Sequence, residues 1–200
     1  MTRTHAEQLL RLVRKQKILR SQDLAPLAIS RATLTRLERQ GLLRRIGRGL
    51  YIEPESDLSE HSSLAEAAKR VPTGVICLLS ALQFHELTTQ VPHEVWLAIP
   101  NKAHKPVVDW PPLRIVRYSP RALEEGVEQH RLERVPVSIT SPARTVADCF
   151  KYRGKIGLDV ALEALRDYMR QRNRDLDALW KAASLQRVAN VMRPYMEALT

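Results

Sequence analysis

The chain has 200 residues, of which 44% are hydrophobic and 27% charged, so it can bury one sizeable core or two small ones and is not intrinsically disordered. Its formal net charge of +10 favours a polyanionic partner. The two cysteines, Cys77 and Cys149, each lie in an apolar stretch, which argues against a disulfide framework or a cysteine metal site and favours buried thiols. There is neither a signal-peptide core nor an apolar run long enough for a bilayer, so we expect a soluble cytoplasmic protein with no membrane partner.

The positive charge is concentrated in the first quarter of the chain. Residues 1–53 contain 12 Lys and Arg against 4 Asp and Glu, a net charge of +8. Residues 54–200 contain 20 against 18, a net charge of +2. A surface that binds a polyanion is therefore expected in residues 1–53.

Two helices are predicted before residue 28. The first covers about residues 5–17, because Thr4 and Glu7 form a capping-box pattern and the apolar residues that follow recur at helical spacing. The second begins after Ser21 and is expected to be short or bent, since it contains Pro26.

A third helix and a two-stranded ribbon follow. Ser30 caps the helix, and Gly41 ends it in the left-handed conformation that glycine tolerates best. Residues 42–46 and 50–52 form the strands of the ribbon, joined by a tip at residues 47–49. Three short helices followed by such a ribbon are typical of a winged helix-turn-helix, whose third helix enters the major groove of DNA.

The exposed side chains of the third helix and of the ribbon are the candidate DNA contacts. They are Ser30, Arg31, Thr33, Thr35, Arg36, Arg39, Arg44, Arg45 and Arg48. The helix residues from Arg31 to Arg36 are expected to read bases, whereas Arg39 and the two strand arginines bind phosphates. Arg48, at the ribbon tip, reaches the minor groove or the backbone. A basic helix or hairpin alone is more often a solvated surface, but the combination favours DNA.

The rest of the chain is predicted to form a second domain. An acidic, polar stretch at residues 54–60 is the expected linker, so residues 1–53 and 61–200 form separate domains. Strands are expected at residues 75–78, 95–100, 113–118 and 135–140. Helices are expected at about residues 64–71, after a cap at Ser80, and over most of residues 141–199. The fold class is therefore α+β: an N-terminal winged helix-turn-helix followed by a mixed strand and helix domain with a helical C-terminal end.

Three segments carry a resemblance to a known family. The stretch DLAPLAISRATLTRLERQGLLRRIGRGLYI resembles the winged helix of the AbiEi antitoxins, bacterial transcriptional regulators of type IV toxin-antitoxin operons. The downstream stretches GVICLLSALQFHEL and VPVSITSPARTVADCF are similar to the strand-then-helix pieces that follow it in that family. The resemblance implies a repressor that binds double-stranded DNA, the repeats of its own promoter, through residues 1–53. It also implies that the second domain counteracts a nucleotidyltransferase-like toxin.

Motifs for catalysis are missing from the sequence. The two His-Glu pairs, at residues 85–86 and 93–94, lack the second histidine that a zinc protease motif requires. The sequence has no GxxxxGK phosphate loop, and no Glu-x-Lys of the kind found in metal-dependent nuclease cores. We therefore expect no enzymatic activity, no cofactor and no metal.

Arg144 and Asp148 stand four residues apart on a predicted helix. The favoured interpretation is an ion pair that braces this helix against the sheet. The other is that Arg144 contacts a partner.

Two alternative functions stay open. The first alternative to the antitoxin function is a stand-alone winged-helix transcription factor whose second domain binds a ligand or dimerises. The second is an RNA-binding or nuclease-like protein. The RNA alternative is less favoured, since Tyr51 is the only aromatic residue among residues 1–53 and stacking on bases needs aromatic side chains. No coiled-coil heptad indicates an obligate dimer.

Overall fold

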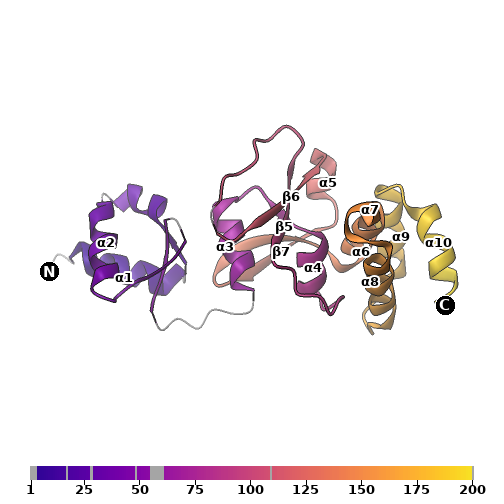
Figure 1. Ribbon diagram of the computed structural model, residues 1–200, viewed down its shortest axis with the longest axis horizontal. Helices are drawn as coiled ribbons and strands as arrows, with labels where there is room; N and C mark the ends of the chain where they lie inside the picture. The colour runs from indigo at the N-terminus through magenta and orange to yellow at the C-terminus, as the bar shows by residue number, and fades with distance from the viewer. Residues whose placement is uncertain are drawn as a thin grey trace. The chain divides into compact units, whose positions relative to one another are not determined.

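A computed structural model describes residues 4–16, 18–27, 29–47, 49–54, 61–108 and 110–199. The chain is α+β (Figure 1). It divides into two compact units. Unit 1 contains Met1–Pro72, Pro106–Leu113 and Arg131–Val137, and unit 2 contains Thr73–Lys105, Arg114–His130 and Ser138–Thr200. None of the helices in the described ranges is long and apolar enough to span a bilayer.

The N-terminal helices follow the sequence pattern closely. Helix α1 (His5–Gln16) begins with the predicted capping box: the Thr4 hydroxyl accepts a hydrogen bond from the Glu7 amide (3.3 Å), and the Glu7 carboxylate accepts one from the Thr4 amide (3.1 Å). The short second helix is the 3-10 helix η1 (Ser21–Leu27), and the third is α2 (Arg31–Arg39). The predicted caps and helix positions are confirmed.

A three-stranded antiparallel sheet completes the N-terminal segment. Its order is β1 (Leu19–Arg20), β3 (Leu50–Ile52) and β2 (Arg44–Gly47), so β3 lies in the centre. The predicted ribbon corresponds to β2 and β3, whereas β1 was not predicted. The helices and the sheet enclose a core of apolar side chains that includes Leu9, Val13, Leu24, Leu34, Leu37 and Leu43.

A second, mixed sheet has five strands. They are β4 (Val75–Ile76), β5 (Val95–Pro100), β6 (Leu113–Tyr118), β7 (Val127–Leu132) and β8 (Val135–Thr140). The order is β6-β5-β4-β8-β7, with β4 antiparallel to β5 and parallel to β8. The sequence predicted four of these strands and missed β7.

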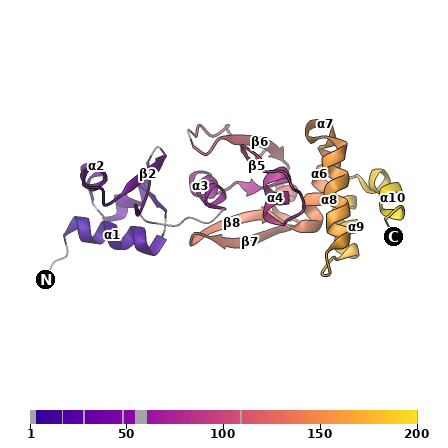
Figure 2. The ribbon, with the colours of Figure 1, turned by 60° about the horizontal axis from the view of Figure 1, so that its bottom comes forward.

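Further helices lie along the described part of the chain, and its C-terminal end is helical as predicted (Figures 1 and 2). They are α3 (Ser62–Arg70), α4 (Leu78–Phe84), α5 (Pro120–Glu124), α6 (Pro142–Lys151), α7 (Arg153–Ile156), α8 (Leu158–Arg170), α9 (Leu176–Leu185) and α10 (Ala189–Glu197). Helix α6 is central, since residues 143–150 are all buried and the helix packs against α4, α8 and α9. Ser141 caps it through a hydrogen bond from the Arg144 amide (3.3 Å), and Pro142 occupies the first turn. Both cysteines are buried free thiols, as predicted.

The predicted cap at Ser80 is wrong. Helix α4 begins at Leu78, with Cys77 in the cap position, so Ser80 lies inside the helix and is 2% exposed. Its hydroxyl accepts a hydrogen bond from the Trp96 amide (2.9 Å). Ser80 therefore links α4 to β5, because a buried hydroxyl needs a partner and the neighbouring strand supplies one.

Candidate nucleic-acid interface

Helix α2 separates an apolar face from an arginine-bearing face. Leu34 and Leu37 are each 1% exposed and point into the core of the N-terminal segment. The exposed residues of the helix are Arg31, Ala32, Thr35, Arg36 and Arg39. At the turn of an α-helix these positions share the side opposite the two leucines. The arginines and Thr35 are thus presented together, away from the core.

Ser30 acts as the predicted cap, and Thr33 is less exposed than Arg31, Thr35, Arg36 and Arg39. The Ser30 hydroxyl accepts a hydrogen bond from the Ala32 amide (3.2 Å), so it holds the start of the helix. Thr33 is only half-exposed, because its position on the helix adjoins the buried face. Ala32, which was not predicted, lies in the middle of the outward face. Helical periodicity places Ala32 on this face, but an alanine side chain has no hydrogen-bonding group that would mark it as a contact residue.

The end of α2 turns the chain directly into the hairpin. Gly41 has a φ of +69°, and the amide of Leu42 donates to the carbonyl of Leu37 (2.9 Å). This turn is the usual helix ending at a left-handed glycine. The first hairpin strand, β2, then begins at Arg44, shortly after the helix ends at Arg39.

The hairpin adds two exposed arginines. Arg44 and Arg45 lie on β2, opposite Ile52 and Tyr51 of β3, and a bulge follows between Arg45 and Gly47. The predicted contact at Arg48 lies outside the described residues.

The returning strand of the hairpin is held at a tight approach. Gly49 has a φ of +71°, its carbonyl accepts a hydrogen bond from the Ser21 amide (2.8 Å), and a Cβ at this position would lie 2.7 Å from the Ser21 hydroxyl. Glycine adopts this positive φ without strain and, having no Cβ, leaves room for the Ser21 hydroxyl.

Arg144 and Asp148 form a buried ion pair within α6. The Arg144 Nε and the Asp148 Oδ1 are 2.9 Å apart, and the two side chains are 1% and 0% exposed. The other guanidinium nitrogens donate to the backbone carbonyls of Glu125 and, at 3.1 Å, of Ala122. The pair therefore ties α6 to α5 and to the turn that follows α5.

Tyr118 completes this network. Its hydroxyl donates to the second carboxylate oxygen of Asp148 (2.7 Å), and the guanidinium of Arg144 lies 5.5 Å from the centre of its ring. Burial raises the pKa of Asp148, and Arg144 opposes that shift. Because the donors and acceptors of Arg144 and Asp148 are used inside the protein, this geometry is that of a brace.

Metal-binding side chains do not gather in the part of the chain that the structure describes. Among those residues, no three His, Cys, Asp or Glu side chains come together in a way that would hold an ion.

A capped helix that presents arginines outward, followed at once by a basic hairpin, is the arrangement seen in DNA-binding transcriptional regulators. Residues 7–54 match a family model described as "Transcriptional regulator, AbiEi antitoxin". The predicted resemblance to the AbiEi family is thus confirmed for the N-terminal segment, and the match ends at residue 54. No curated protein sequence matches the chain.

Proposed function

We propose that the chain is a sequence-specific DNA-binding autorepressor and the antitoxin of a type IV toxin-antitoxin system. In this proposal residues 1–53 form a winged helix-turn-helix that binds promoter repeats, and residues 54–60 link it to residues 61–200. The second domain counteracts a nucleotidyltransferase-like toxin and carries no enzymatic activity of its own. The protein acts in the cytoplasm. The family match at residues 7–54 supports the regulator and antitoxin role.

The observation that carries the DNA-binding role is the outward face of α2. The major groove is about 12 Å wide and admits an α-helix. Arg31 and Arg36 would donate to guanine edges, and Thr35 would bond to either base. The exposed methyl group of Ala32 would lie against a thymine methyl group. Thr33, half-exposed at the edge of this face, would make a peripheral contact.

The hairpin and the end of the helix would fix the register on DNA. Arg39, Arg44 and Arg45 are exposed and would bind phosphates, whereas Arg48 would reach the minor groove or the backbone. Phosphate contacts of this kind add affinity for any sequence, so specificity rests on α2.

The test of base reading compares Arg36→Ala with Arg45→Ala in the full chain, on duplexes of its own promoter in which each base pair is changed in turn. Arg36→Ala should lose about 1–3 kcal/mol of discrimination at one base position. Arg45→Ala should weaken binding to all duplexes alike. If neither change affects binding to the promoter, the DNA-binding role of this surface is wrong.

The test of the antitoxin role is co-expression with the product of the neighbouring reading frame. A double variant, Arg36→Ala with Arg39→Ala, should lose promoter binding and still rescue growth, because its changes lie outside residues 61–200. Failure of the wild-type chain to rescue growth would favour a stand-alone transcription factor. Metal-dependent cleavage of nucleic acid by the purified chain would contradict the proposal and favour a nuclease.

A further inference from the structure

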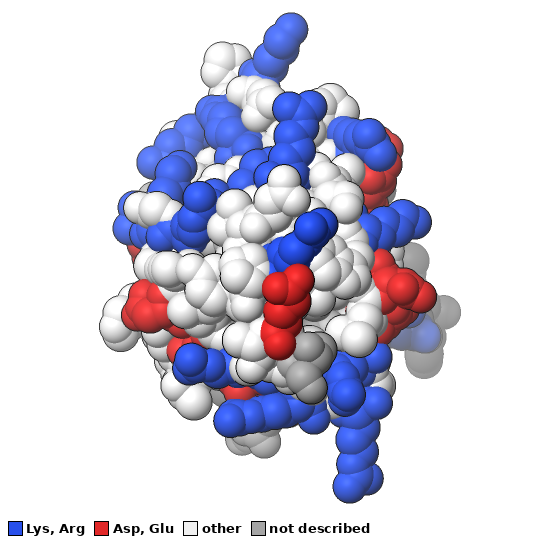
Figure 3. Space-filling view, turned by 90° about the vertical axis from the view of Figure 1, so that its right-hand side faces the viewer, with Lys and Arg blue, Asp and Glu red and all other residues white. Residues whose placement is uncertain are grey.

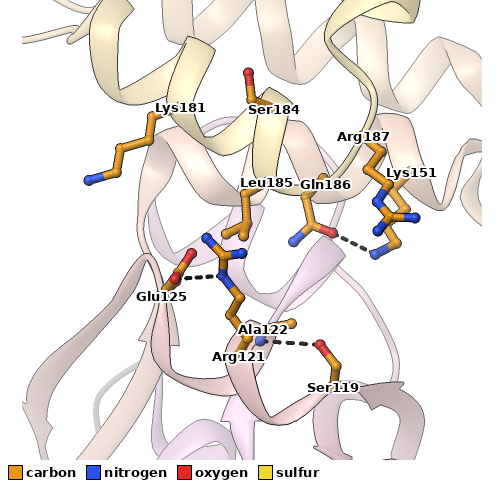
Figure 4. Close-up of a pocket in the computed structure, with 10 residues that line it drawn as sticks. All are labelled: Ser119, Arg121, Ala122, Glu125, Lys151, Lys181, Ser184, Leu185, Gln186 and Arg187. Atoms are coloured by element: carbon orange, nitrogen blue, oxygen red, sulfur yellow. Dashed lines mark hydrogen bonds and ion pairs between the residues drawn. The ribbon is translucent and has the colours of Figure 1, made fainter.

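Unit 2 contains a polar pocket that the proposed function does not use. It has a volume of about 710 Å³ and lies between α5, the end of α6 and the turn from α9 to α10 (Figure 4). The lining residues that matter here are Arg121, Glu125, Lys151, Lys181, Gln186 and Arg187. This volume falls within the usual range for small-molecule sites, about 300–1,000 Å³.

The pocket is electropositive. Four of its lining side chains are cationic, and Glu125 is the one carboxylate among the lining residues. That carboxylate is already engaged, since its Oε1 accepts a hydrogen bond from the Arg121 Nε at 2.7 Å. The lining therefore keeps an excess of positive charge. Figure 3, which faces the side of the C-terminal helices, also shows Lys and Arg outnumbering Asp and Glu over its upper half.

One cation of the pocket is fixed by a buried amide. Gln186 is 4% exposed, and its side-chain oxygen accepts a hydrogen bond from the Lys151 Nζ at 2.6 Å. Figure 4 shows the two side chains reaching toward each other, with Arg187 beside Lys151. This hydrogen bond uses one of the three donors of the lysine ammonium group and leaves two for a ligand.

The backbone at Arg187 gives a second, independent observation. Arg187 has a φ of +59°, and the amides of Arg187 and Val188 donate to the carbonyls of Ser184 (3.0 Å) and Ala183 (2.8 Å). This is the left-handed helix ending at which glycine is preferred, and an arginine there costs free energy that a glycine would avoid. Such strain, at a residue that lines a pocket, points to a functional side chain.

The lining indicates the chemistry of the ligand. None of the lining residues is aromatic, so a nucleobase would find no stacking surface. The four cationic side chains that line the pocket carry nitrogen donors, which suit the oxygens of phosphate groups. We infer that this pocket binds the polyphosphate group of a small phosphorylated ligand, held by Lys151, Lys181 and Arg187.

The test is a calorimetric titration of the full chain with tripolyphosphate at constant ionic strength. Saturable binding is expected for the wild type. The double variant Lys181→Glu with Arg187→Glu should bind at least about tenfold more weakly, because two charge-assisted contacts are lost and reversed. A matched variant, Arg172→Glu with Arg174→Glu, changes exposed arginines that do not line the pocket and should bind as the wild type does.

Two further measurements separate a ligand role from other roles. Arg187→Gly should raise the thermal unfolding temperature and weaken tripolyphosphate binding, a combination that a purely structural arginine would not give. Arg36→Ala should leave tripolyphosphate binding unchanged, so failure of the DNA-binding proposal would not be mistaken for failure of this one. The inference is overturned by a lack of saturable binding up to about 1 mM. It is also overturned if the pocket variants weaken binding to a random DNA duplex while tripolyphosphate does not bind.

Discussion

Arg144 and Asp148 lie one helical turn apart on α6 and form an ion pair of 2.9 Å that is at most 1% exposed. Tyr118 and two backbone carbonyls satisfy the remaining polar atoms of the pair. A buried ion pair is weak evidence for net stabilisation, but the loss of one partner leaves the other charge without compensation. Removal of one partner alone should therefore destabilise the protein more than removal of both.

Arg144→Met should lower the free energy of unfolding by about 3–5 kcal/mol, because it leaves the Asp148 carboxylate buried without its counter-ion. The measurement is urea unfolding at pH 7. The matched control is Arg170→Met, which breaks the exposed pair with Asp167 and should change stability by no more than about 0.5 kcal/mol. Adding Asp148→Asn to Arg144→Met should recover part of the loss. Equal losses of stability in Arg144→Met and Arg170→Met would show that the pair in α6 is not a brace.

The buried carboxyl group of Glu66 should make the free energy of unfolding depend on pH. Glu66 lies on α3, is 3% exposed, and burial raises its pKa to about 7, while Arg70 opposes the shift. In the unfolded chain a glutamate titrates near pKa 4.3. Between these values the folded state binds more protons than the unfolded state, so stability falls as pH rises from about 4.5 to about 7 and is level above that.

Glu66→Gln should remove this fall. At pH 8 the variant should be more stable than the wild type by about 1–3 kcal/mol, and at pH 4 the difference should vanish. The check is urea unfolding of the wild type and of the variant, each at pH 4 and at pH 8. A stability difference that is the same at pH 4 and pH 8 would contradict the raised pKa.

Gly41 and Gly49, which share a left-handed backbone conformation, should respond differently to substitution by alanine. At Gly41 an added Cβ meets open space, whereas at Gly49 it meets the Ser21 hydroxyl at 2.7 Å. Gly41→Ala should therefore cost about 1 kcal/mol of backbone strain, and Gly49→Ala should cost more. Thermal unfolding of both variants measures this, and Ser21→Ala should relieve part of the extra cost at Gly49. A larger loss at Gly41 would mean that the hairpin does not approach Ser21 as described.

Local patterns predicted those parts of the fold that depend on neighbouring residues. Thr4 and Ser30 act as caps in the structure because their side chains bond to amides within three residues. Strand β1 was missed because two residues cannot show an alternating pattern. Strand β7, VEQHRL, was missed because its side chains are polar or charged except at its ends. In each of these cases pairing with another strand, and not local preference, fixes the conformation.

The candidate sites also combine contacts that neighbouring residues predict with contacts that only tertiary packing creates. The spacing of Arg144 and Asp148 predicted their pairing, but no sequence pattern indicated that Tyr118 would join them. The polar pocket draws on residues from 119 to 187, which only the packing of α5, α6 and α9 brings together. The arginines of α2 were predictable, since helical periodicity places them opposite Leu34 and Leu37.

The salt dependence of promoter binding tests the central claim most directly. The dissociation constant of the full chain for its own promoter is measured against salt concentration for the wild type and for Arg39→Ala with Arg44→Ala. Each lost phosphate contact should reduce the slope of log K against log salt by about 1, so the double variant should lose about 2. Arg166→Ala with Arg170→Ala removes the same charge from the exposed side of α8 and should keep the wild-type slope. An unchanged slope for Arg39→Ala with Arg44→Ala would contradict DNA binding through α2 and the hairpin.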